Sequence, residues 1–205
     1  MTYTVHDVFL TMQGEGANLG RVAVFVRFSG CNLWSGREED RATAVCRFCD
    51  TEFRGGTKYP TADELADVVA SHWPEGRHHK RVVLTGGEPL LQVDAALLRA
   101  LRERGFWLAV ETNGTQPLPG HIDWVCVSPK AGTVLALDEA DELKLVYPQE
   151  GVSPEDFETF PAPNRWLSPM DGPSLAANTA AAAAFCRANP GWRLNIQAHK
   201  TWGVP

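Results

Sequence analysis

The chain has 205 residues, of which 44% are hydrophobic and 21% charged, with a net charge of −6. This length and composition predict one domain, spanning residues 1–205, with a core of its own. The acidic balance and the lack of a dense Lys/Arg run argue against a nucleic-acid surface. The N-terminus has no signal-like pattern and no apolar stretch reaches about 18 residues, so we expect a cytoplasmic protein without a membrane span.

Short apolar runs and amphipathic runs alternate along the chain. In chain order they predict a strand at 22–28, a helix at 61–73, a strand at 81–85, a helix at 93–105, strands at 107–111, 124–128, 142–147 and 165–169, and a helix at 174–191. We expect only loose structure at 35–44, 54–60 and 148–163. Strands that alternate with helices indicate a parallel α/β sheet or barrel.

Polar segments follow four of these strands. They are "GGEP" at 86–89, "TNG" at 112–114, "SPK" at 128–130 and "SPMDG" at 168–172. In parallel α/β folds the carboxyl ends of the strands lie on one side, which is where ligands bind. The sequence therefore predicts that four segments far apart in the chain meet at one site.

Three cysteines lie close together in the chain and no fourth accompanies them. Fourteen residues separate Cys31 from Cys46, and two separate Cys46 from Cys49. Zinc with a histidine as fourth ligand, a redox dithiol and an iron–sulfur cluster all remain open on this spacing. Cys126 and Cys186 lie within a predicted strand and an Ala-rich helix, where we expect small buried side chains.

An iron–sulfur cluster with three thiolates leaves one iron without a protein ligand. That iron can bind a chelating amino acid, such as the methionine end of S-adenosylmethionine (SAM). The Glu88 carboxylate of "GGEP" can accept hydrogen bonds from the ammonium group of such a ligand. On this interpretation the open position is where the chemistry takes place.

The cysteine segment and "GGEP" together resemble the radical SAM superfamily. The wide cysteine spacing, with "QGEG" (13–16), "FVRFSGCNLW" (25–34), "CDT" (49–51), "ETNG" (111–114), "SPK" (128–130) and "HKTWGVP" (199–205), is similar to the 7-carboxy-7-deazaguanine synthase family. Most radical SAM proteins have the shorter spacing CxxxCxxC. The resemblance covers residues 5–205 and implies a modified, incomplete TIM-type barrel with few helices.

This resemblance implies a ring contraction. The family converts 6-carboxy-5,6,7,8-tetrahydropterin to 7-carboxy-7-deazaguanine with loss of ammonia, in queuosine and 7-deazapurine biosynthesis. It implies a [4Fe–4S] cluster, SAM that is regenerated in each turnover, and Mg²⁺. It also implies a homodimer, a reductant protein such as flavodoxin, and a radical from SAM in place of a protein acid or base.

The resemblance assigns site residues by motif. The cluster ligands would be Cys31, Cys46 and Cys49, and Thr51 would offer an oxygen to Mg²⁺. The SAM site would be lined by Phe48, Cys49, Asp50, Gly87, Glu88, Ser128, Pro129, Lys130, Ser168, Pro169, Met170 and Asp171. The pterin would face Met12, Gln13, Gly14, Glu15, Arg27, Thr85, His199 and Pro205.

One position departs from the family pattern, in which Gln is frequent before "PMDG". Here the residue is Ser168, which predicts a weaker or water-mediated contact with the SAM adenosine. Two other functions remain open at this point. A glycyl-radical activase would carry the short cysteine spacing, and a zinc-binding module would hold zinc and no iron.

Overall fold

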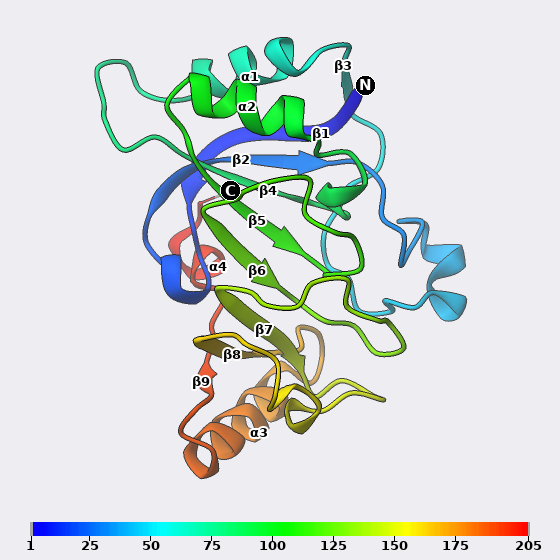
Figure 1. Ribbon diagram of the computed structural model, residues 1–205. Coiled ribbons are helices and arrows are strands. Elements are labelled where there is room, and N and C mark those ends of the chain that lie inside the picture. The colour runs from blue at the N-terminus through cyan, green and yellow to red at the C-terminus, as the bar shows by residue number, and fades with distance from the viewer. Residues whose placement is uncertain (1, 205) are drawn as a thin grey trace.

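The computed structural model describes residues 2–204 and contains one nine-stranded sheet (Figure 1). The strand order is β3-β1-β2-β4-β5-β6-β7-β8-β9. The strands are β1 Tyr3–Met12, β2 Val22–Phe28, β3 Thr57–Tyr59, β4 Arg81–Gly86, β5 Trp107–Thr112, β6 Trp124–Val127, β7 Glu142–Tyr147, β8 Asn164–Pro169 and β9 Arg193–Leu194.

Every neighbouring pair from β2 to β9 is parallel, whereas β1 pairs antiparallel with both β2 and β3. The carboxyl ends of β2 and β4–β8 therefore lie along one edge of the sheet, as the sequence predicts. Such a run of parallel strands fits an incomplete TIM-type barrel.

Few helices accompany this sheet. They are α1 Ala62–Ser71, α2 Ala95–Glu103, α3 Leu175–Ala188 and the short α4 Ala198–Trp202. Helices α1 and α2 lie together beside β1 and β2, while α3 lies beside β8 and β9 at the other end of the sheet (Figure 1). Short 3₁₀ turns occur at Gly16–Asn18, Glu38–Thr43, Pro89–Leu91 and Pro154–Phe157.

The two faces of the parallel strands differ in chemistry because side chains alternate along each strand. One face carries an apolar core in which Val24, Val26 and Phe28 of β2 pack with Leu84 and Val110 of the next strands. On the other face, polar or charged side chains occur at intervals, starting with the paired positions Arg27 and Thr85. Helices α1, α2 and α3 pack on the apolar face, and the second face is left to form a site.

All six predicted strands and all three predicted helices are present, with ends that shift by a few residues. Thr61 caps the first of these helices, because its side chain accepts a hydrogen bond from the Glu64 amide. The sequence interpretation missed β1, whose register is broken by a bulge between Val5 and Asp7, and it missed the short β3, β9 and α4. No helix within residues 2–204 is long and apolar enough to cross a membrane.

Candidate active site

A cavity of about 410 Å³ opens at the carboxyl ends of the strands. All four polar segments predicted to meet contribute to its lining. They do so through Gly86, Gly87, Thr112, Asn113, Ser128, Lys130, Ser168, Pro169 and Asp171. The prediction of a single site built from distant segments is confirmed.

The three clustered cysteines also line this cavity. The thiols of Cys46 and Cys49 lie within hydrogen-bonding reach of each other. Cys31 lies near enough to Cys49 for a charge on Cys49 to raise the pKa of Cys31. The hydrogen bond from the Cys46 thiol lowers the pKa of Cys49 to about 6, while burial raises the pKa of Cys31. The thiol most easily ionised is therefore Cys49, the last of the three in the chain.

Within residues 2–204, no three His, Cys, Asp or Glu side chains are grouped as ligands of a single metal ion. A four-iron cluster requires a different arrangement, because each thiolate binds its own iron around the cage. The three thiols that line this one cavity supply the number of ligands that such a cluster takes when one iron stays open. The residues present therefore suit a cluster that has one iron open to a ligand in the cavity.

The "GGEP" turn packs directly against the first cysteine. The Glu88 amide donates to the Gly30 carbonyl (2.9 Å), and a Cβ added to Gly87 would lie 2.0 Å from the same oxygen. Only glycine at 87 allows this approach. The turn thus holds the backbone before Cys31 against the end of β4.

The structure shows which groups hold Glu88 in place. Its side chain is fully buried, and it accepts hydrogen bonds from the Thr112 hydroxyl (2.7 Å) and from the amides of Asn113 (2.8 Å) and Leu90 (3.0 Å). The carboxylate thus joins the ends of β4 and β5, and Glu88 is not among the residues that line the cavity. Pro129 and Met170 also lie outside the lining.

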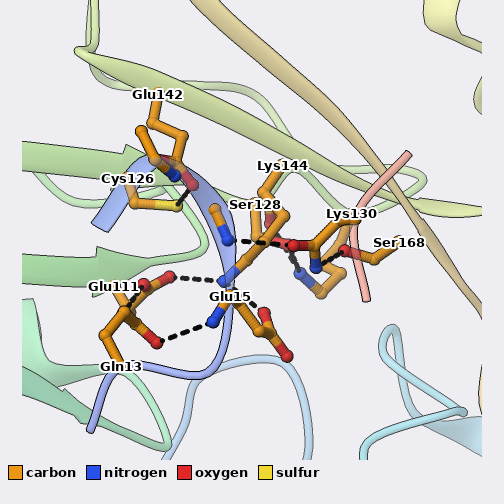
Figure 2. Close-up of polar contacts among 12 residues, drawn as sticks. Gln13, Glu15, Glu111, Cys126, Ser128, Lys130, Glu142, Lys144 and Ser168 are labelled. Atoms are coloured by element: carbon orange, nitrogen blue, oxygen red, sulfur yellow. Dashed lines mark hydrogen bonds and ion pairs between the residues drawn. The ribbon is translucent and has the colours of Figure 1, made fainter. Parts of the chain in front are cut away.

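A charged network occupies the polar face of the sheet. Lys144 of β7 pairs with Glu15 (2.7 Å) and with Glu111 of β5 (2.8 Å). The Gln13 side chain donates to the other Glu111 oxygen (3.1 Å). Figure 2 shows these four side chains turned toward one another, with Gln13 and Glu15 supplied by the turn after β1.

Burial and opposite charge act against each other in this network. Burial raises the pKa of Glu15, but the Lys144 ammonium outweighs it and holds the pKa below its ordinary value. Burial lowers the pKa of Lys144, yet Glu111 and Glu15 together raise it well above the ordinary value. Glu15 and Lys144 are therefore both ionised at neutral pH.

A second buried carboxylate, Glu142, contacts the backbone that follows Glu15. Glu142 accepts from the Ala17 amide (3.0 Å) and from the Cys126 thiol (3.6 Å; Figure 2). A Cβ on Gly16, which has a φ of 66°, would lie 1.9 Å from a Glu142 oxygen. Burial and the charge of Glu111 raise the pKa of Glu142. Cys126 is buried as expected, whereas Cys186 is only partly buried.

Ser168 is held by a residue that the sequence interpretation did not single out. The buried Asn195 side chain donates to the Ser168 hydroxyl (2.8 Å) and accepts from the Gly16 amide (2.9 Å). Asn195 therefore connects the end of β8 to the turn that carries Glu15. The neighbouring Lys130 ammonium donates to the Ser128 hydroxyl (2.8 Å), and burial lowers the pKa of Lys130.

The chain's last described segment lies along the cavity through Gln197, His199 and Lys200. Lys200 pairs with Asp171 (2.5 Å) and Asp50 (3.1 Å), so α4 joins the cysteine loop to the segment after β8. The other predicted lining residues are also in place: Met12, Gly14, Arg27, Phe48, Thr51 and Thr85. Pro205 lies outside the described residues.

Glu111, Lys144, Glu142 and Asn195 were not singled out from the sequence. A signal exists for two of them, because Glu142 and Lys144 interrupt the apolar run "ELKLVY" at alternate positions. Charges at a spacing of two within a buried strand point to one face. Nothing in the sequence marks Asn195, since its role depends on two segments that meet only in the fold.

The comparisons with known proteins agree with this geometry. Residues 41–140 match the model of the radical SAM superfamily. The chain is 54% identical to the 7-carboxy-7-deazaguanine synthase of Bradyrhizobium diazoefficiens and 53% identical to that of Caulobacter vibrioides, with 100% of both chains covered in each case.

A solved structure extends the likeness to the fold. The crystal structure of QueE from Escherichia coli superposes with a TM-score of 0.70 at 25% identity, covering 97% of this chain and 95% of that one. The incomplete TIM-type barrel is thereby confirmed. The chain belongs to the 7-carboxy-7-deazaguanine synthase family of radical SAM enzymes, which acts in queuosine biosynthesis.

Proposed function

We propose that this chain contracts 6-carboxy-5,6,7,8-tetrahydropterin to 7-carboxy-7-deazaguanine, with loss of ammonia. The observation that carries the proposal is the position of the three cysteine thiols, which line the same cavity as Arg27 and the Gln13–Glu15 turn. A cluster site and a site for a small polar molecule are thus parts of one enclosure. This is the arrangement that a radical reaction on a bound substrate needs.

Cys31, Cys46 and Cys49 would hold the [4Fe–4S] cluster. When bound and reduced, the cluster would supply the electron for radical chemistry from SAM, and SAM would be used catalytically. Residues from the strand ends, Gly87, Ser128, Lys130, Ser168 and Asp171 among them, would line the SAM site. Glu88 would accept a hydrogen bond from the SAM ammonium group, and its contacts with Thr112, Asn113 and Leu90 would fix the turn whose backbone approaches the cluster.

Arg27 would bind the substrate carboxylate. A guanidinium offers paired donors that match a carboxylate in a forked geometry, which an ammonium cannot supply. Arg27 leans over the Phe9 ring, with its Cζ atom 5.4 Å from the ring centroid, and both side chains line the cavity. The apolar ring beside the charge restricts the orientations open to the guanidinium.

Gln13 and Glu15 would form hydrogen bonds with the amide and amino groups along one edge of the pterin. Each already has one partner in the Lys144 network, which fixes its orientation before a ligand arrives. The remaining carboxylate and amide groups provide acceptors and a donor for a guanidine-like edge. His199, whose ring packs against Gly14, would close the site from the C-terminal side.

Mg²⁺ would take an oxygen from Thr51, since this hard cation accepts few protein ligands and keeps waters or substrate oxygens. A flavodoxin-type electron donor and a homodimer complete the proposal; these parts come from the family resemblance. A cytoplasmic location belongs to it as well, because cluster thiolates must stay reduced.

The test is an anaerobic assay of the reconstituted protein with the pterin, SAM, Mg²⁺ and a reductant. We expect many turnovers of product per chain without a matching loss of SAM. SAM cleavage without product would remove the proposed substrate and keep the radical chemistry. A protein shown to contain its cluster that does neither would contradict the proposal.

A further inference from the structure

The spacer between the first two cysteines folds back on itself. The Cys46 amide donates to the Leu33 carbonyl (3.1 Å), so residues 34–45 leave and rejoin the chain at nearly the same place. The excursion contains the 3₁₀ turn Glu38–Thr43 and is mostly exposed. A closed loop of this kind adds length between Cys31 and Cys46 without moving them apart.

Arg41 makes contacts on both sides of this loop. Its guanidinium stacks on the Trp34 ring, with Cζ 4.1 Å from the centroid. The same side chain donates through Nη1 to the carbonyls of Arg47 (3.0 Å) and Cys49 (3.1 Å). Its Nε donates to both oxygens of Glu38 (2.9 and 2.7 Å), which fixes the direction of the planar group.

Trp34 gives this contact a fixed base. Its side chain is buried, and its indole nitrogen donates to the Arg37 carbonyl (3.0 Å). The ring also meets Phe53 edge to face, with centroids 5.6 Å apart. Arg41 therefore connects a rigid aromatic pair next to the first cysteine with the backbone of the third.

We propose that Arg41 is a positioning residue that fastens the 34–45 loop and holds the backbone at Cys49 in place for the cluster. The inference rests on the proposed function, since it takes Cys31, Cys46 and Cys49 as the ligands. Without this side chain, the carbonyls of Arg47 and Cys49 lose their shared donor. The Cys46–Cys49 segment, which has no helix or strand of its own, would then sample other conformations.

An arginine suits this position better than a lysine. Two carbonyls, a carboxylate and an aromatic face are all satisfied by one planar group with several donors. An ammonium at position 41 could keep the attraction to Glu38 and donate to one carbonyl, but it has no plane to stack on Trp34. Arg41→Lys should therefore hold the backbone at Cys49 less firmly than arginine does, but more firmly than Arg41→Ala.

The test compares Arg41→Ala and Arg41→Lys with Arg37→Ala. Arg37 is a matched control, because its exposed side chain in the same loop pairs only with Glu39 (3.7 Å) among the residues that the structure describes. After anaerobic reconstitution, iron and sulfide per chain are measured, and the reduced cluster is recorded by electron paramagnetic resonance. An iron chelator is then added, and the loss of cluster absorbance gives a rate constant. Thermal unfolding of the cluster-free proteins is measured in parallel.

We expect Arg41→Ala to lose its cluster about ten-fold faster than the unmodified chain, as the loss of one charged hydrogen bond would give. The rate constant of cluster loss for Arg41→Lys should lie between these two values, and that for Arg37→Ala should equal the value for the unmodified chain. The cluster-free proteins should all unfold at similar temperatures. Equal rates and spectra for both Arg41 variants and the control would overturn the inference. An unmodified chain that takes up no cluster would instead contradict the proposed function.

Discussion

Replacing Lys144 with Met removes the positive charge from a buried site that keeps two carboxylates. The side chains of Lys144, Glu15 and Glu111 are only 12%, 15% and 20% exposed. Removing one partner of a buried ion pair costs about 3–5 kcal/mol, and we expect about 3 because the cavity admits some water. For a chain of this length that is a fall in melting temperature of roughly 6–12 °C.

The assay is urea unfolding of the cluster-free protein at neutral pH, for Lys144→Met, Glu111→Gln and the double variant. Because Glu111→Gln removes one of the two carboxylates left without a partner, the double variant should lose less stability than the sum of the singles, by at least about 1 kcal/mol. Losses that simply add, or a Lys144→Met variant as stable as the unmodified chain, would refute the view that this network is ionised and mutually dependent.

Three other changes test separate parts of the site. Gly16→Ala should raise the KM for the pterin, because its Cβ would collide with Glu142 and displace the turn that carries Glu15. Gly20→Ala is the control for backbone strain, since Gly20 has a similar φ of 81° with open space around it, and this variant should leave KM unchanged. Glu88→Gln should lower the free energy of unfolding by about 1–3 kcal/mol, since its amide would face the Asn113 amide donor; unchanged urea unfolding would contradict the assigned hydrogen bonds. Burial raises the pKa of Glu15 but Lys144 outweighs it and holds the pKa below its ordinary value, so this carboxylate contributes stability at neutral pH and loses it as the pH falls through the lowered pKa. The difference in unfolding free energy between the unmodified chain and Glu15→Gln should narrow in urea titrations run from neutral pH downward, and a constant difference would count against this expectation.

The sequence was enough to predict where the site lies, because strand ends are marked by local signals. Gly86 and Gly87 end one apolar run, and "SPK" ends another, so parallel strands alone bring them together. The direction of a buried side chain carries no such signal. For Glu88 the sequence suggests only a bound amine as partner, whereas Thr112, Asn113 and Leu90 also donate to it, and only the fold places these donors there.

The Lys144 network shows why part of the candidate site could not be predicted from the sequence. Its members come from the turn after β1, from β5 and from β7, and each is an ordinary charged or amide residue in its own segment. Alternation along β7 puts Leu143 and Leu145 into the core and leaves Lys144 on the opposite face. The same strand thus contributes to the core with one set of side chains and orients the Gln13–Glu15 turn with the other, so a one-residue shift in its register would remove both contributions.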